Sequence, residues 1–283
     1  MSELTVVHLA RGSNGPAPLE RFLESYRAHH AGTPHRLLVV FKGYAQEDAL
    51  IKEEAYARSF GADTLRLARD DLFDIGAYRE SASVIESRYV AFFNSFSEIV
   101  ADEWLARLHC GIRQQGVGLV GATGSWESHA SAALQRIRAR SLPTDLINWL
   151  YVWRLFPHFP NPHIRTTGFI IQRDIFLGLK GAETRSKQLA YVFESGWAGM
   201  TRQIERQGLK ILVAGRDGQY FEKKDWPESG TYCADGQSNL IVQDNHTRKY
   251  DTGSTAWRRE LQRRAWERPA LAGARRRHIE VES

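Results

Sequence analysis

The chain has 283 residues, of which 42% are hydrophobic and 25% are charged, a composition typical of a globular protein with a hydrophobic core. Its two cysteines, Cys110 and Cys233, exclude a disulfide framework, and no uncharged apolar stretch approaches the ~20 residues that a membrane-spanning helix needs. The start of the chain lacks the charged and apolar regions of a signal peptide, so we predict a cytoplasmic protein.

The net charge of +5 is unevenly distributed along the chain. Residues 254–283 contain eight Arg, no Lys and four Glu, which gives this segment a charge of +4. The other residues carry 30 basic and 29 acidic side chains, a balance of +1. Such a balanced body argues against a broad nucleic-acid-binding face, and binding through the tail alone is the weaker alternative.

In chain order, the first 121 residues alternate between short apolar runs and segments with helical spacing. The apolar runs predict strands, and the spaced segments between them predict helices. Strands are predicted at 4–9, 37–41, 64–67, 89–93 and 117–121, and helices at 18–30, 47–60, 73–86 and 101–113. This alternation predicts an α/β fold with a mainly parallel sheet flanked by helices, whose strands all release their following loops at one edge.

The second half is less regular, and we place it in the same single domain, residues 1–253. Further strands are predicted at 167–172, 209–213 and 240–242, helices at 130–140, 145–156, 185–193 and 196–207, and a polar loop at 244–250. Residues 174–179 are predicted to turn, and residues 220–238 are rich in turn-forming residues. The remaining segment, 254–283, is predicted to form a basic helix and tail.

The stretch from 72 to 99 is the best pointer to a functional site. A helical segment beginning with Phe73 and Asp74 feeds a buried strand that ends in Asn94. Polar residues at the carboxyl end of a parallel strand face the crevice where open α/β sheets bind ligands. The common alternatives lack a motif: the chain has no Gly-rich dinucleotide loop, no Walker lysine, no Gly-x-Ser-x-Gly and no zinc spacing.

Several segments share the order of known sequence motifs. Residues 73–79, FDIGAYR, are similar to a loop and helix written Asn-x-Gly-x-x-x-Ala-Arg-Asn, and residues 166–176, TTGFIIQRDIF, to a strand written Gly-x-x-x-x-Arg-Arg-x-x-Phe. Residues 89–97 resemble a strand that ends in Asp-x-Asp. From residue 5 to 250 this order resembles the GT-A glycosyltransferases, close to the family-2-like group that uses nucleotide sugars.

This resemblance implies a GT-A fold and transfer of a sugar, such as a hexose, from a nucleotide sugar to a hydroxyl of a glycan or lipid-linked acceptor. In such enzymes the acceptors include bacterial envelope polysaccharides. The roles that the resemblance implies are a catalytic base at Glu194; nucleotide-sugar binding at Asp74, Arg79, Asn94, Arg248 and Lys249; acceptor binding at Trp197; and metal binding at His246 and Asp244.

Each of these residues also has a structural interpretation. Asp74 and Glu194 suit helix starts, where a carboxylate is favoured by the helix dipole. Trp197 could pack in the core, and His246 could be a surface histidine in its polar loop.

At the strand end, Asn94-Ser95-Phe96-Ser97 stands where the resembled enzymes have Asp-x-Asp. Mn²⁺ or Mg²⁺ bound to a diphosphate prefers anionic oxygen ligands, which these side chains lack. Three interpretations follow. Arg or Lys replaces the metal; Glu98, Asp244 and His246 assemble a metal site; or the protein is a non-catalytic GT-A-fold subunit or carbohydrate-binding protein.

The tail combines Trp257 and Trp266 with several Arg at roughly helical spacing. A basic helix with aromatic residues is typical of attachment to an anionic membrane surface, here the inner face of the membrane. A helix that is solvated or that docks on a partner is the equal alternative.

Overall fold

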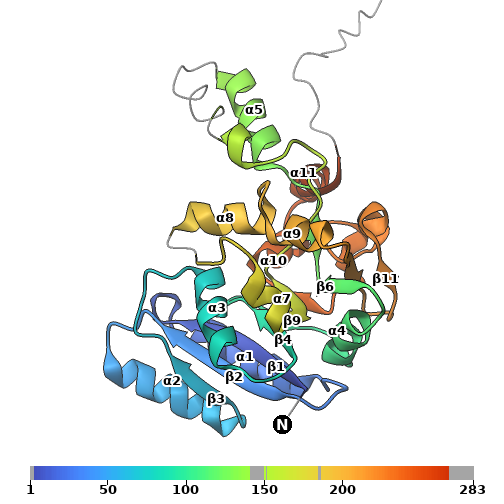
Figure 1. The fold of residues 1–283 in the computed structure, drawn as a ribbon. Coiled ribbons are helices and arrows are strands. Elements are labelled where there is room, and N and C mark those ends of the chain that lie inside the picture. The colour runs from blue at the N-terminus through green and yellow to red at the C-terminus, as the bar shows by residue number, and fades with distance from the viewer. Residues whose placement is uncertain (1–2, 141–149, 151, 184–185, 268–283) are drawn as a thin grey trace, which may run out of the picture.

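An eight-stranded sheet forms the centre of the fold in the computed structural model, which describes residues 3–140, 150, 152–183 and 186–267 (Figure 1). The strands run in the order β11-β10-β6-β9-β4-β1-β2-β3. Their bounds are β1 Leu4–Arg11, β2 Arg36–Lys42, β3 Asp63–Arg66, β4 Tyr89–Phe93, β6 Val117–Gly121, β9 Gly168–Gln172, β10 Lys210–Ala214 and β11 Tyr220–Phe221. Only β9 and β11 run antiparallel to their neighbours, which confirms the α/β class and the mainly parallel sheet.

Two apolar clusters, one on each face of the sheet, form the core. Alternate residues of each strand enter opposite clusters, as the pleat requires: Val6 packs in one cluster, and Val7 packs in the other. The first cluster includes helices α1 (Ala17–Ala28), α2 (Glu47–Ser59) and α4 (Trp104–Ile112). The second includes α3 (Asp74–Val84), α7 (Arg173–Gly178), α8 (Lys187–Ser195) and α9 (Met200–Arg206). Each fully buried aliphatic or aromatic side chain contributes roughly 1.5–3 kcal/mol.

Two short antiparallel pairs join segments that are distant in sequence. β5 (Glu98–Ile99) pairs with β12 (Val242–Gln243), and β7 (Gly124–Ser125) pairs with β8 (His163–Ile164). The first pair holds the segment after β4 against the segment that begins at Asp244. The two segments that we expected to carry the site therefore lie at the same edge of the sheet.

The structure corrects three details of the sequence prediction. The predicted polar loop 244–250 is helix α10 (Asn245–Asp251), because the Asp244 side chain accepts from the His246 and Thr247 amides in a capping box. The predicted turn at 174–179 is α7, and Glu194 lies in the last turn of α8 instead of between two helices. The helix predicted at 145–156 falls mostly outside the described residues.

The remaining elements are α5 (His129–Arg140) and three short 3₁₀ segments, Gly12–Asn14, Lys223–Glu228 and Asp235–Gln237. Helix α11 (Thr255–Trp266) is the described part of the basic tail, and the proposed boundary at residue 253 falls between α10 and α11. None of the helices in the described ranges has the length and hydrophobicity needed to cross a bilayer.

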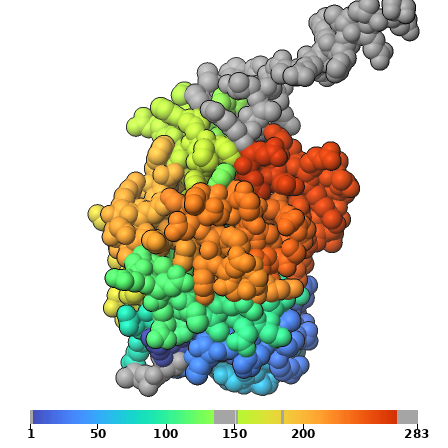
Figure 2. All heavy atoms as spheres, turned by 90° about the vertical axis from the view of Figure 1, so that its right-hand side faces the viewer, coloured from blue at the N-terminus to red at the C-terminus, as the bar shows by residue number. Residues whose placement is uncertain are grey.

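The end of α11 packs on the body of the protein (Figure 2). Trp266 is 8% exposed, donates its indole N–H to the Tyr232 carbonyl at 2.7 Å and lies edge-on to Trp126. Trp257, near the start of α11, is 42% exposed. The tail helix therefore turns one of its two tryptophans inward and leaves the other at the surface.

Candidate functional site

A cavity of about 340 Å³ lies at the carboxyl ends of the parallel strands, which is where α/β sheets place ligands. We call it the central cavity. Three carboxylates and three basic side chains line it, together with Asn94 and His246. The charged lining residues are Asp74, Glu194, Asp244, Arg11, Arg165 and Lys187. A more open depression of about 630 Å³ lies along residues 26–35, before β2, but its lining includes no carboxylate.

Glu194 is held in place by one oxygen of its carboxylate. Its Oε1 accepts from the Thr166 amide at 2.9 Å and from the Thr166 hydroxyl at 3.2 Å, whereas no described residue donates to Oε2. Helix α8 ends at Ser195, where the backbone of Gly196 becomes extended, and only a glycine fits there because a Cβ would lie 2.6 Å from the Val192 carbonyl oxygen. The Asn161 amide also caps the helix through the Ser195 carbonyl at 2.7 Å. Glu194 thus presents an oriented carboxylate oxygen, the geometry that a general base requires.

Arg165 and Asp244 form a buried ion pair in the wall of the central cavity. The Arg165 guanidinium is 3.3 Å from Asp244 Oδ2, and its Cζ lies 4.0 Å from the centre of the Tyr232 ring. Burial raises the pKa of Asp244, but Arg165 and the hydrogen bonds from Thr167 and the Thr247 amide outweigh it and hold this pKa at about 2. Burial also disfavours the Arg165 cation, yet Tyr232 and Asp244 keep its pKa above the ordinary value. The pair is therefore ionised and satisfied within the protein.

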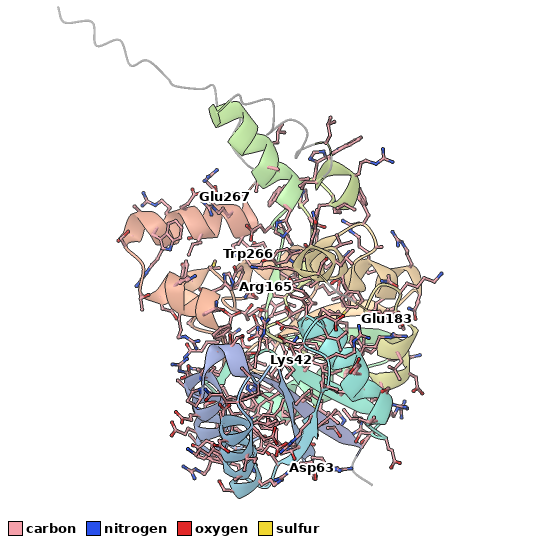
Figure 3. The ribbon with its side chains drawn as sticks, turned by 90° about the vertical axis from the view of Figure 1, so that its left-hand side faces the viewer. Lys42, Asp63, Arg165, Glu183, Trp266 and Glu267 are labelled. Atoms are coloured by element: carbon pink, nitrogen blue, oxygen red, sulfur yellow. The ribbon has the colours of Figure 1, made fainter. Side chains whose placement is uncertain are left out.

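Asp74 faces two cations that the sequence prediction did not include. Arg11 ends β1 and Lys42 ends β2, and Asp74 begins α3 on the same face of the sheet. Burial raises the pKa of Asp74, whereas Lys42 and Arg11 act to lower it. Figure 3 shows Lys42 at the end of the strands nearest Arg165, with Asp63 at the opposite end. Arg11 and Asp74 line the central cavity, and Lys42 lies beside Arg11 behind that lining.

Asn94 follows β4 and lines the cavity, as predicted for a residue released at the strand end. Its Oδ1 accepts from the Phe96 amide at 2.8 Å and from the Ser97 hydroxyl at 3.2 Å, which fixes an Asx turn. With both lone pairs of that oxygen engaged, Asn94 offers the cavity its amide N–H donors.

The donor set does not fit a divalent cation bridging a diphosphate. The Asn94 oxygen is engaged in its turn, and the Asp244 carboxylate oxygens accept from His246, Thr247, Thr167 and Arg165. Across the described residues, no group of three or more His, Cys, Asp or Glu side chains is placed to hold a metal ion. Loss of surrounding water and the nearby Arg165 lower the pKa of His246, so its ring is neutral at pH 7 and supplies no positive charge.

Five of the nine predicted site residues line the central cavity: Asp74, Asn94, Glu194, Asp244 and His246. The other predicted cations lie outside its lining. Arg79 donates to the Leu177 carbonyl at 2.7 Å and lines a separate cavity of about 290 Å³. Arg248 pairs with Glu98 at 2.8 Å and donates to the Phe96 carbonyl at 3.2 Å. Lys249 is exposed on α10.

Trp197, the predicted acceptor residue, also lies outside the cavity lining. It is 46% exposed and stacks with the Arg202 guanidinium at 5.3 Å. Sequence reasoning missed Arg11, Lys42, Arg165 and Lys187. Arg11 and Lys42 carried the same signal as Asn94, because each is a polar residue at the carboxyl end of a buried strand. No local sequence pattern identifies Arg165 and Lys187 as site residues. Both reach the wall of the central cavity only through the tertiary fold.

Neither a family model nor a curated protein sequence matches the chain. Among solved structures, it is similar to mannosyltransferase PcManGT from Pyrobaculum calidifontis in complex with GDP-Man and Mn²⁺, with 13% identity and a TM-score of 0.46 over 81% of this chain and 59% of that one. It is also similar to GalNAc-T7 with UDP, GalNAc and Mn²⁺, with 16% identity and a TM-score of 0.49 over 75% of this chain and 41% of that one.

A third similar structure is glucosyl-3-phosphoglycerate synthase from Mycobacterium tuberculosis in complex with Mn²⁺, UDP and glucosyl-3-phosphoglycerate. It shows 16% identity and a TM-score of 0.36, and the match covers 61% of this chain and 57% of that one. The chain thus spans less than two thirds of the length of each of these structures. At these identities and TM-scores the likeness carries no argument about activity.

Proposed function

We propose that the protein is a GT-A-type glycosyltransferase that moves a sugar from a nucleotide-sugar donor to a hydroxyl of a glycan or lipid-linked acceptor. This proposal rests on one observation: a carboxylate and a set of cationic and hydrogen-bond-donating groups lie on different walls of the same cavity. Glu194 presents an oriented carboxylate oxygen on one wall, and Arg11 and the Asn94 amide supply positive charge and donors at the strand ends. Acid–base chemistry and stabilisation of an anionic leaving group are the two requirements of sugar transfer from a nucleoside diphosphate.

The proposed reaction is a direct displacement. The acceptor oxygen attacks the anomeric carbon while Oε2 of Glu194 takes the proton of the acceptor hydroxyl. The bond between the anomeric carbon and the diphosphate oxygen breaks, and its electron pair stays on the leaving diphosphate. Cationic side chains neutralise that charge without reorganisation at the moment of reaction. Asp74, at the start of α3, is proposed to accept hydrogen bonds from the nucleoside side of the donor.

The experiment is turnover across a panel of UDP and GDP sugars, with hydrolysis or transfer as the readout. Glu194→Gln keeps the size of the side chain and removes the base, so we expect turnover to fall about 10²-fold or more while donor affinity stays within about twofold. Retained turnover in this variant would remove Glu194 from the mechanism. Glu205→Gln, on α9 and outside the cavity lining, is the matched control.

The second candidate is a non-catalytic subunit or carbohydrate-binding protein. The neutral Asn94 and the poor fit of a divalent cation favour it. It predicts donor binding without turnover and no effect of Glu194→Gln on any function of the protein. A role in bacterial envelope polysaccharide synthesis, and attachment to the inner face of the membrane through the exposed arginines of α11, are further proposals. Sedimentation with vesicles containing anionic lipid tests the attachment.

A further inference from the structure

We propose that one face of helix α8 is the acceptor subsite, and that it takes a saccharide carrying an anionic group, either a phosphate or a carboxylate. Tyr191 holds the face of the sugar ring, and Lys187 binds the anionic group. The role of this saccharide as the acceptor of a transfer rests on the proposed function, whereas the saccharide subsite itself does not.

Four residues of α8 line the central cavity, and they lie on one face of the helix. They are Lys187, Ala190, Tyr191 and Glu194, at the spacing i, i+3, i+4 and i+7 that brings side chains to the same face. We call this face the α8 wall. With a rise of ~1.5 Å per residue, its first and last residues are about 10.5 Å apart along the helix axis. The α8 wall is therefore long enough to contact a sugar ring and a substituent beyond it.

Helix geometry directs the Glu194 side chain towards the rest of the α8 wall. The Cα–Cβ bonds of a helix tilt towards its N-terminus, so a side chain covers the turn before its own. For Glu194 that turn carries Ala190 and Tyr191. Thr166 holds Oε1, and no described residue donates to Oε2. A hydroxyl that donates to Oε2 therefore belongs to a molecule lying over the small Ala190 side chain and against Tyr191.

Tyr191 offers the cavity an aromatic face that the described protein leaves partly open. It is 38% exposed although it lines the cavity. The His129 ring supports it at a centroid distance of 5.2 Å, and the same ring lies 4.8 Å from the Phe156 ring. The C–H groups on one face of a pyranose pack well on an aromatic ring, and a side chain that is already held in place loses little freedom on binding. The supported Tyr191 ring therefore suits a sugar.

Lys187 supplies a cation at the amino end of the α8 wall. Its side chain is exposed, and its Nζ lies 5.7 Å from the centre of the Tyr191 ring. Within the described residues no carboxylate forms an ion pair with it, whereas Arg165, also in the cavity lining, is matched by Asp244. An anionic substituent on a ring that packs against Tyr191 reaches Lys187 for a charge-assisted hydrogen bond. The α8 wall can therefore distinguish a charged saccharide from a neutral one.

The α8 wall is separate from both Trp197 and the strand ends. Trp197, the residue that the sequence predicts to bind the acceptor, follows the end of α8 and lies outside the cavity lining. Arg11 and Asn94 stand at the strand ends, where the donor is proposed to bind. Tyr191 and Lys187 thus take the role that the sequence assigns to Trp197.

The test is titration of the full chain, followed by saturation-transfer NMR, with the 6-phosphates of glucose, galactose and mannose, the matching hexuronates and the neutral methyl glycosides. The phosphates or the uronates should bind at least tenfold tighter than the glycosides, and the tighter class identifies the anion. Lys187→Met should abolish this preference and leave binding of the glycosides within twofold of the wild type. Tyr191→Ala should weaken binding of every ligand at least tenfold, whereas Tyr191→Phe keeps the ring and should bind within threefold.

Leu189→Ala is the matched control, because Leu189 is 51% exposed on the same helix and lies outside the cavity lining. It should bind within twofold of the wild type. Tyr191→Ala and Lys187→Met also replace exposed side chains, so the melting temperatures of all three variants should stay close to that of the wild type. The melting temperatures thus separate a loss of binding from a loss of folding.

Three results would overturn the subsite: no binding of any of these ligands at millimolar concentration, equal binding of charged and neutral ligands, or unchanged binding by Tyr191→Ala. Weaker binding of UDP and GDP by Tyr191→Ala would also overturn it, because Tyr191 would then belong to the donor site. The proposed function fails separately. Saccharide binding that depends on Tyr191, with no turnover of any nucleotide sugar, would keep the subsite and reject the transferase. Turnover with an unchanged acceptor KM in Tyr191→Ala would do the reverse.

Discussion

Replacing Asp244 by Asn should destabilise the protein strongly at neutral pH, because Asp244 joins the capping of α10 to the charge of Arg165. Its side chain is 2% exposed and accepts four hydrogen bonds, from the His246 and Thr247 amides, the Thr167 hydroxyl and Arg165. Asn can still accept from the two amides, but its NH₂ group would face the Thr167 hydroxyl and the Arg165 guanidinium. That leaves a buried cation without its partner.

The magnitude follows from the pKa of Asp244, which is about 2 in the folded protein against an ordinary 3.8. At ~1.36 kcal/mol for each pH unit, this difference corresponds to about 2.5 kcal/mol. The folded pKa lies below the ordinary value, so the stabilisation is complete above pH 3.8 and is lost as the pH falls towards 2. About half of it should remain at pH 3.

Urea denaturation of the wild type and of Asp244→Asn at pH 7, 5 and 3 measures this contribution. The difference in unfolding free energy between the two proteins should be about 2.5 kcal/mol at pH 7 and at pH 5, and about half of that at pH 3. Asp48→Asn, exposed on α2, should change stability by less than about 0.5 kcal/mol at each pH. A difference for Asp244→Asn that does not shrink between pH 5 and pH 3 would refute the electrostatic reasoning and leave only the lost packing.

Two further substitutions test the tail and the outer ion pair. Trp266→Ala should lower the unfolding free energy measured in urea by about 3 kcal/mol, because this side chain is 8% exposed. Trp257 is 42% exposed on the same helix, so Trp257→Ala should lower it by less than about 1 kcal/mol. Equal losses in the two variants would contradict the docking of α11. Glu98→Gln removes the carboxylate 2.8 Å from Arg248 and, for a partly buried pair that still contacts water, should cost about 1 kcal/mol. Nucleotide-sugar affinity should not change in Glu98→Gln, and a rise of threefold or more in calorimetry would place Arg248 in the donor site.

The strands and most helices could be predicted because their signals are local. The run from 89 to 93 is buried along its whole length and was predicted with the bounds that β4 has. Asn94 could be proposed for the same reason, since it follows a strand recognisable from its neighbours, whereas Glu194 was proposed from the resemblance to GT-A glycosyltransferases. The prediction erred at 244–250, where a capping box of Asp244 and Thr247 starts a helix that a polar composition does not suggest.

Tertiary structure alone decided which charges are free to act. In sequence, Arg248 and Lys249 stand beside His246 and look as available to a diphosphate as any other cation. Folding pairs Arg248 with Glu98, which is 150 positions away in the chain, and leaves Lys249 outside the cavity. The β1–β2 register meanwhile sets Arg11 beside Lys42, and folding brings Asp74 to face both of them. A sequence specifies the position of each charge along the chain, but its pairing and its burial depend on contacts between distant segments.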